Sequence, residues 1–296
     1  MIEYEIKPLT DEEKELIEKK LSEYADSMAP SVPRTEEERF VYKVENEDGK
    51  VIGGCIVNIH KWGRAVLAQL WVNEQYRHNG IGSMLIRAAE QISKEKGCYY
   101  ICLGTLDFMA KPLYEKHGFK VFTVNHDLPK GHTGWSMAKR LDKNAPDYTP
   151  KNNSAEKRYT VKPGGDEDAK TVDEGLDRYC DRFIPPNSNE DIPLNRKLVD
   201  ADGNIIAAVL AEVDADMSTD IDGVWVEELY RNKGIGSYLL SQVEREAKEK
   251  GTYLFIGNAC DWNIDFFTKN GYTVMGTLED YPKGHTAYEF EKKVTE

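Results

Sequence analysis

The sequence predicts an α/β protein built from two similar tandem domains, each a mixed, mostly antiparallel sheet flanked by helices. The main observation is a phrase of thirteen residues, 71–83, that returns at 225–237 with nine identical positions. A second observation is the pentapeptide Pro-Lys-Gly-His-Thr, found at 129–133 and again at 282–286. The offset between the copies is 154 residues for the first match and 153 for the second. A repeat of this length indicates one fold present twice.

The length of 296 residues also favours two domains. We expect the first domain over residues 1–143 and the second over residues 158–296. Residues 144–157 are polar, contain two prolines and lack an apolar period, which is typical of a linker.

The first half of each copy is predicted to form a strand, a helix and a hairpin. The strand and helix are expected at 4–7 and 11–25 in the first copy and at 159–162 and 166–180 in the second. An Asp-Gly pair, at 48–49 and 202–203, then predicts a tight turn between strands. The apolar runs after these turns, 51–60 and 205–213, are expected to be strands, and a further strand leads into each Trp-Val pair.

The second half of each copy begins with an amphipathic helix. Its apolar residues recur at helical spacing, namely Ile81, Met84, Leu85, Ala88, Ala89 and Ile92, and again Ile235, Tyr238, Leu239, Val243 and Ala247. Gly97 and Gly251 follow at the position where glycine ends a helix. A strand, a short helix before Gly118 or Gly271, and two strands flanking Pro-Lys-Gly-His-Thr complete each copy.

The start of each amphipathic helix carries the pattern Arg-x-x-Gly-x-Gly. Glycine lets a ligand approach the backbone closely. The first amides of a helix have no partner within the helix and carry partial positive charge. The pattern therefore predicts an anion site of the pyrophosphate kind, although a glycine at a helix start is often only a tight turn.

The composition excludes several classes of protein. Residues 1–150 hold 21 Lys and Arg against 23 Asp and Glu, a net charge of −2, and residues 151–296 hold 18 against 29, a net charge of −11. Such a surface disfavours nucleic acid and suits a cationic partner, or simply keeps the second copy soluble. No apolar run reaches membrane-spanning length. The five cysteines form no Cys-x-x-Cys pair, so we expect reduced thiols, no metal site and a cytoplasmic protein.

The order of elements and two motifs resemble the GNAT superfamily of acetyl-CoA-dependent N-acetyltransferases. One motif is a strand entering Arg-x-x-Gly-x-Gly, at 70–83 and at 224–237. The other is 110–119, Ala-Lys-Pro-Leu-Tyr-Glu-Lys-His-Gly-Phe, with 263–272 in the second copy. The resemblance covers nearly all of both copies.

The resemblance implies that coenzyme A is held by main-chain atoms. The turn would bind the pyrophosphate, and the preceding strand would pair with the pantetheine arm. The tryptophan side chains are expected to point into the core. The implied positions in the first copy are Leu70, Trp71, Val72, Arg77, His78, Asn79, Gly80, Ile81, Gly82 and Ser83. Those in the second copy are Val224, Val226, Arg231, Asn232, Lys233, Gly234, Ile235, Gly236 and Ser237.

The resemblance also implies a general acid, Tyr114, which would protonate the departing thiolate. Packing at the base of a short helix is the other interpretation of this residue. The second copy differs here, because Phe267 stands at the position of Tyr114 and Ala259 at that of Thr105. The second copy is therefore expected to bind coenzyme A without catalysis, or to keep the turn only as scaffold.

The general base stays open. The candidates are Asp107, Gln69 through a water molecule, and His117, which is also suited to the end of a helix. His132 and His285 lie in the shared pentapeptide, and a structural role fits them at least as well as a chemical one.

The predicted function is acetyl transfer from acetyl-CoA to a primary amine, a small cationic one, through a ternary complex. Two alternatives remain: a non-catalytic acyl-CoA-binding sensor, and a second copy that works alone. The acceptor stays open among an antibiotic, a polyamine, an amino acid and a protein N-terminus or lysine. The sequence names neither the acceptor nor the oligomeric state, a homo-oligomer included.

Overall fold

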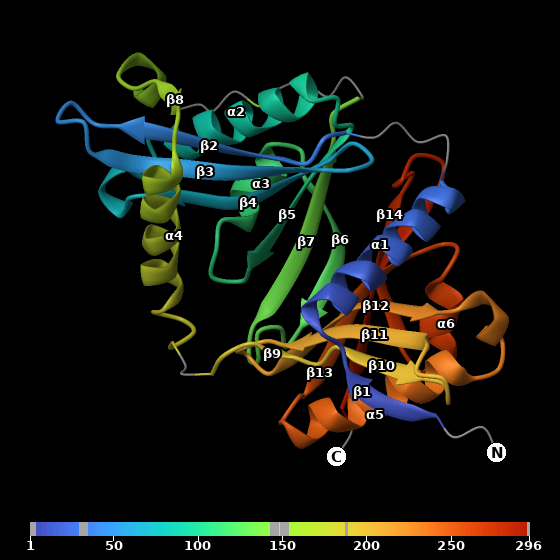
Figure 1. The fold of residues 1–296 in the computed structure, drawn as a ribbon. Coiled ribbons are helices and arrows are strands. Elements are labelled where there is room, and N and C mark those ends of the chain that lie inside the picture. Colours follow the sequence, from blue (N-terminus) through green and yellow to red (C-terminus); the bar gives the residue numbers. More distant parts are fainter. Residues whose placement is uncertain (1–3, 30–34, 143–147, 149–153, 187–188, 295–296) are drawn as a thin grey trace. The chain divides into compact units, whose positions relative to one another are not determined.

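The computed structural model describes residues 4–29, 35–142, 148, 154–186 and 189–294. Its contacts divide the chain into two compact units. We call residues 32–186 the central unit, and residues 1–31 together with 187–296 the terminal unit. Figure 1 shows a sheet with flanking helices in each.

The central unit is a seven-stranded sheet in the order β6-β7-β5-β4-β3-β2-β8. Its strands are β2 Glu38–Glu45, β3 Val51–His60, β4 Arg64–Val72, β5 Tyr100–Leu106, β6 Lys120–His126, β7 Thr133–Arg140 and β8 Val161–Pro163. Its helices are η1 Glu74–Tyr76, α2 Ile81–Glu95, α3 Lys111–Lys116, η2 Ser154–Lys157 and α4 Asp166–Cys180. Among these neighbours β4 and β5 are parallel and the other pairs are antiparallel.

The terminal unit repeats this arrangement in the order β1-β10-β11-β12-β13-β15-β14, with β9 beside β11. Its strands are β1 Glu5–Pro8, β9 Ile192–Pro193, β10 Arg196–Val199, β11 Ile205–Val213, β12 Ser218–Val226, β13 Leu254–Cys260, β14 Thr273–Glu279 and β15 Thr286–Lys293. Its helices are α1 Asp11–Met28, η3 Glu228–Tyr230, α5 Ile235–Glu249 and α6 Ile264–Lys269. The predicted mixed sheet with flanking helices is therefore confirmed for both copies.

The two copies exchange their first strand and helix. β1 of the first copy pairs with β10 of the second, while β8 of the second copy pairs with β2 of the first. The compact units therefore differ from the predicted division at 1–143 and 158–296, because each copy lends its opening segment to the sheet of the other. The boundaries of the copies within the sequence stay a prediction.

The predicted linker also contributes to the central unit. Within 144–157 the structure describes Tyr148 and Ser154–Lys157, and the rest lies outside the described residues. Ser154–Lys157 forms a short 3-10 helix whose Ala155 belongs to the hydrophobic core. The Ala155 amide donates to the Asn79 carbonyl at 3.0 Å. This segment consequently braces the turn that precedes α2.

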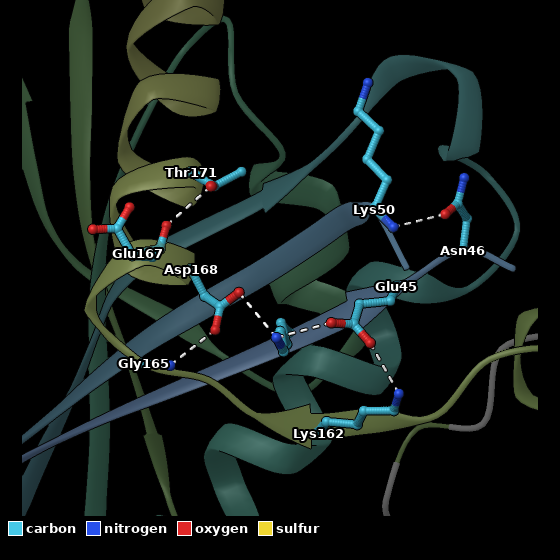
Figure 2. A network of polar contacts seen from close by, with 9 residues as sticks. Glu45, Asn46, Lys50, Lys162, Gly165, Glu167, Asp168 and Thr171 are labelled. Atoms are coloured by element: carbon cyan, nitrogen blue, oxygen red, sulfur yellow. Dashed lines mark hydrogen bonds and ion pairs between the residues drawn. The ribbon is translucent and has the colours of Figure 1, made fainter. Parts of the chain in front are cut away.

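The exchanged helix α4 is held to β2 by a charged network, which Figure 2 shows. Lys43 Nζ lies 3.0 Å from Asp168 Oδ1 and 2.8 Å from Glu45 Oε1, and Lys162 Nζ lies 2.9 Å from Glu45 Oε2. Hydrogen bonds from Lys43 and then Lys162 lower the pKa of Glu45 to about 2. Asp168 also accepts from the Gly165 amide at 2.9 Å, capping α4.

The terminal unit repeats this contact with its own exchanged helix. Lys197, which corresponds to Lys43, pairs with Glu13 on α1. Glu13 also accepts from the Thr10 amide at 2.9 Å in a capping box. In both units a lysine of the sheet thus forms a salt bridge with the acidic residue that caps the exchanged helix.

Two side chains show how closely α4 seats on the central sheet. A Cβ atom built on Gly175 of α4 would lie 2.4 Å from Cε2 of Trp71, so the indole occupies the space of a missing side chain. A Cβ on Gly54 of β3 would lie 2.5 Å from Val172 of α4 and 2.8 Å from the carbonyl oxygen of Tyr42. Glycine at both positions allows helix and sheet to meet.

We expect Gly54→Ala to lower the free energy of unfolding by about 1–3 kcal/mol, because the new methyl group overpacks a close interface that includes backbone. Gly104→Ala, also in a strand of this sheet, is the matched control, since its Cβ would meet nothing within 4 Å. It should change stability by less than about 0.5 kcal/mol. Urea unfolding followed by tryptophan fluorescence measures both. Equal stability of the two variants would contradict the close seating of α4.

Candidate active site

The centre of each sheet opens between its two parallel strands. β4 pairs with β5 at three positions, the last being Val66 with Cys102. β4 nevertheless continues to Val72, paired on its other side with β3. Ala68 is an extra residue at the irregularity between Gln69 and Leu67, where the strand changes register. Beyond it, the edge of β4 that faces β5 has backbone groups outside this ladder, which an extended ligand can pair with.

The loop after β4 leads into the start of α2. Arg77 Nε donates to the Val72 carbonyl at 3.0 Å, which ties the loop to the end of the strand. His78 and Gly80 have φ of 62° and 99°, and Gly80 precedes α2 without a side-chain cap. The first amides of α2 therefore have no side-chain partner from Gly80, and they carry the partial positive charge of a helix start. An anion of the pyrophosphate kind fits this geometry.

The terminal unit contains the same construction. Arg231 Nε donates to the Val226 carbonyl at 2.9 Å. Asn232 and Gly234 have φ of 60° and 79°, and Gly234 caps α5 as Gly80 caps α2. Here β12 pairs with β13 as far as Ile221 and then diverges. The geometry for binding an anion beside a strand edge is thus present twice.

The strand residues implied to hold the cofactor face two ways. Leu70 and Val72 pack against the core that contains α2, whereas Trp71 lies against α4 and is buried. Alternation along a strand produces this arrangement. In the terminal unit Val224 and Val226 likewise pack against the core, and Trp225 joins the cluster beneath α1. Both tryptophan side chains thus point into the interior.

Tyr114 is placed by α3 in the core of the central unit. Its ring is 8% exposed and packs edge-on against Phe119, with 5.9 Å between ring centroids. Burial raises the pKa of Tyr114. The phenol is therefore protonated throughout the neutral pH range, as a proton donor must be. Phe267 occupies the corresponding place in the terminal unit, stacked on Phe290.

The three candidate bases have different surroundings. His117 is buried and shares a hydrogen bond of 3.0 Å with Ser83 Oγ, so it joins the end of α3 to the start of α2. Gln69 is half-buried on β4 beyond the last residue paired with β5. Asp107 is held by His132 Nδ1 at 2.9 Å and by the Thr133 amide at 3.1 Å. The hydrogen bond from His132, together with the Thr133 amide, lowers the pKa of Asp107, which makes it a weak base.

The Asp107–His132 pair has a counterpart in the terminal unit. There His285 Nδ1 lies 3.2 Å from Asp261 Oδ1. In both units an aromatic ring next in sequence to the aspartate meets the histidine edge-on, at 5.1 Å between centroids. Because the terminal unit keeps this arrangement without the tyrosine, the pair fits a structural role in fixing the loop that contains the histidine.

One part of the site is not evident from the sequence repeat. The end of α4, from the second copy, reaches the first-copy residues of the central unit. Tyr179 Oη donates to the Phe108 carbonyl at 3.0 Å, and the Arg77 guanidinium lies 4.5 Å from the Tyr179 ring centroid. Phe183 stacks on Phe108, with centroids 4.4 Å apart. The terminal unit has an equivalent contact, which could have indicated this part of the site. Tyr24 has the same position on α1 as Tyr179 has on α4, and the Arg231 guanidinium lies over its ring.

Three further predictions concern metal, membrane and disulfides. Among the described residues, no group of three or more His, Cys, Asp or Glu side chains is arranged to hold a metal ion. None of the described helices is long and apolar enough to cross a membrane. All five cysteines are free thiols, and Cys55, Cys98 and Cys102 are buried.

Comparison with known proteins gives consistent results. The profile of the acetyltransferase (GNAT) family matches residues 4–119 and 166–272. Blasticidin-S acetyltransferase of Streptomyces morookaense is 32% identical over 96 residues, which is 32% of this chain and 70% of that protein. Glucosamine 6-phosphate N-acetyltransferase of Trypanosoma brucei brucei is 35% identical over 78 residues, covering 24% of this chain and 52% of that protein. The crystal structure of an acetyltransferase from Bacillus cereus ATCC 14579 has 36% identity and a TM-score of 0.43, covering 46% of this chain and 96% of that one.

Proposed function

Because the chain belongs to the acetyltransferase (GNAT) family and is an N-acetyltransferase, we propose that its central unit transfers acetyl from acetyl-CoA to a small cationic amine through a ternary complex. We assign catalysis to the central unit because the two units differ in the residue at the position of the general acid. Both units have the turn with a left-handed glycine at a helix start, but only the central unit has a phenol, Tyr114, where the terminal unit has Phe267.

The central unit offers acetyl-CoA two kinds of contact. The amides of residues 77–83 would bind the pyrophosphate at the start of α2, and glycine at position 82 keeps side-chain atoms out of the way. The edge of β4 from Gln69 to Val72 would hydrogen-bond the pantetheine arm as an added strand. An amide of this edge would also polarise the thioester carbonyl.

The reaction needs three proton transfers. The free amine attacks the thioester carbonyl carbon, so a C–N bond forms and the C–S bond breaks. Tyr114 gives its proton to the departing sulfur. An alkyl amine arrives as the ammonium ion, because its pKa is near 10.4, and it loses one proton before attack and another afterwards. The proton taken by the phenolate restores Tyr114, and the other leaves with solvent.

The terminal unit is proposed to bind coenzyme A without turnover. Its turn repeats the backbone geometry of the central unit, with φ of 79° at Gly234 and the Arg231 side chain bound to the Val226 carbonyl. Its core places Ala259 and Phe267, which have no exchangeable proton, where the central unit has Thr105 and Tyr114. Such a unit can sense acyl-CoA but cannot protonate a thiolate.

A cationic acceptor is supported by the charge of the chain, −13 in total. Divided by compact unit, the central residues 32–186 hold 24 Lys and Arg against 22 Asp and Glu, and the remaining residues hold 15 against 30. The net charges are +2 for the central unit and −15 for the terminal unit, so the acidity lies in the unit that we propose to be non-catalytic. An acidic surface raises the local concentration of a cation and speeds encounter. The relatives named above act, by their names, on blasticidin-S and glucosamine 6-phosphate, both small molecules.

A panel of amines with acetyl-CoA, read by thiol release, tests this proposal. We expect the best substrate to be a small cationic amine. Its kcat/KM should fall severalfold between about 20 and 300 mM salt, because screening weakens steering, while kcat changes little. A neutral amine of similar size serves as the control and should show a flat profile. If the best acceptor is neutral or anionic, the negative charge does not attract the substrate and only keeps the protein soluble. If no amine gives thiol release, the protein is better explained as a non-catalytic acyl-CoA-binding sensor.

A further inference from the structure

Tyr179, on the exchanged helix α4, contacts both sides of the opening in the central sheet. Its ring faces the Arg77 guanidinium, with 4.5 Å between Cζ of the arginine and the ring centroid. Its hydroxyl donates to the Phe108 carbonyl at 3.0 Å. Arg77 belongs to the segment after β4, and Phe108 to the segment after β5. Tyr179 therefore joins the segments that follow the two diverging strands.

Arg77 extends this contact to the end of β4. Its Nε donates to the carbonyl of Val72, the last residue of the strand, at 3.0 Å. Its Nη1 lies 3.8 Å from Glu74, which also pairs with Arg182, three residues after Tyr179. The Arg77 guanidinium is thus held by the strand end, by a neighbouring carboxylate and by the ring from α4.

The terminal unit has the same pairing of a turn arginine with a tyrosine of the exchanged helix. Arg231 Nε donates to the Val226 carbonyl at 2.9 Å, and the guanidinium lies 5.2 Å from the ring centroid of Tyr24 on α1. In each unit the arginine comes from one copy and the tyrosine from the other. The exchange of segments is therefore what brings the two side chains together.

We propose that Tyr179 is a positioning residue for the acetyl-CoA site, which fixes the turn of residues 77–83 and the end of β4 relative to the end of β5. The proposal rests on the proposed function, in which the turn binds the pyrophosphate and the edge of β4 pairs with the pantetheine arm. Tyr179 acts through Arg77 on one side and through the Phe108 carbonyl on the other. A site that is already held in place loses less conformational freedom on binding, so its affinity is higher. The central unit thus depends on a residue of the second copy to bind its cofactor.

The test is Tyr179→Ala, which removes both the ring and the hydroxyl. We expect Kd for acetyl-CoA to rise about tenfold, because one cation–π contact and one hydrogen bond are lost. At saturating acetyl-CoA, kcat should stay within about twofold of the wild type, since Tyr114 keeps its place against Phe119. Tyr179→Phe keeps the ring and loses only the hydrogen bond, so Kd should rise about threefold. Calorimetry in a Gly236→Asp background measures the central site alone, and steady-state kinetics measures kcat.

Val172→Ala is the control for a general loosening of α4. Val172 is also on α4, is fully buried, and lies against Gly54 of β3. Shortening it should weaken the seating of the helix and lower the midpoint of urea unfolding, because a buried side chain is truncated. It should leave Kd for acetyl-CoA unchanged. An equal rise of Kd in Val172→Ala and Tyr179→Ala would show that affinity follows the stability of α4, and the positioning role would be wrong.

A double variant tests whether Tyr179 acts through Arg77. In an Arg77→Ala background, Tyr179→Ala should raise Kd by less than about twofold further, because both changes break the same chain of contacts. A further tenfold rise there would overturn the proposal, as would a wild-type Kd in the single Tyr179→Ala variant. If Gly82→Asp leaves the affinity for acetyl-CoA unchanged, the proposed cofactor site itself fails. If Gly82→Asp weakens binding and Tyr179→Ala does not, only this inference fails.

Discussion

Tyr114→Phe is expected to lower kcat by about 10²–10⁴-fold, the usual effect of removing one positioned proton donor. KM for acetyl-CoA should change little, because the cofactor contacts that we propose are main-chain atoms of β4 and of the turn. The protein should remain folded, since the terminal unit carries phenylalanine at this place, 3% exposed and packed among aromatic rings. Steady-state kinetics with the best amine measures the effect.

Tyr100→Phe is the control for this variant. Tyr100 is also buried in the central unit, but it pairs with Arg64 at the start of β4, before the strands diverge. Removing its hydroxyl should leave kcat near the wild-type value. Full turnover by Tyr114→Phe would move catalysis to another residue, and the terminal unit would then have to be considered as the working one.

Gly82→Asp is expected to weaken acetyl-CoA binding to the central unit by about a hundredfold or more. The new carboxylate would lie at the start of α2 against the pyrophosphate, and like-charge contacts cost several kcal/mol. Gly82→Asn adds a side chain of nearly the same size and shape without the charge, which matters because a Cβ here would already lie 3.2 Å from Leu113. The difference between Asp and Asn therefore isolates the electrostatic effect. Calorimetry measures affinity and stoichiometry.

The corresponding change in the terminal unit is Gly236→Asp. If both turns bind, the wild type should show two sites and each variant should lose a different one. We expect Gly236→Asp to keep most of its kcat and Gly82→Asp to lose turnover at ordinary acetyl-CoA concentrations. Unchanged affinity and stoichiometry in Gly82→Asp would show that the pyrophosphate binds elsewhere. Loss of turnover in a folded Gly236→Asp protein would reverse the assignment of the two units.

Most elements of the fold could be predicted because their signals are local. The strands Val51–His60 and Ile205–Val213 and the helix Asp166–Cys180 have the predicted bounds. The turn at Gly49 has the expected positive φ of 78°. Apolar spacing, glycine and capping residues act over a few positions, so a single sequence records them.

The exchange between copies could not be predicted in the same way. Lys43 and Lys197 each pair with an acidic residue at the capping position of a helix. Glu13 and Asp168 are both residues of this kind. Either pairing fits the residue pattern, so the choice depends on how the connecting segments run in space. Tyr179 and Phe183 contact Phe108 only because the segments are exchanged, so these contacts could not be predicted from the sequence either.

The polar contacts of the site were predictable only in part. The two aspartate–histidine pairs join residues about 25 positions apart, and no spacing rule brings Asp107 to His132. Thr105 is an ordinary strand residue in the sequence, and its hydroxyl becomes conspicuous only when the surrounding atoms show that it has no partner among the described residues. Burial and pairing depend on the whole fold, which is why these features required the structure.

The exchanged segments also set an order for synthesis on the ribosome. All of the central unit lies within one continuous stretch, residues 32–186, so it can fold while later residues are still being made. β1 and α1 are synthesised before the central unit but belong to the terminal unit, and Glu13 meets Lys197 only 184 residues later. At a synthesis rate of about 5–20 residues per second, the strand that pairs with β1 is made roughly 10–40 s after β1 itself. During that time a chaperone or a neighbouring nascent chain can reach a strand edge that the finished protein covers.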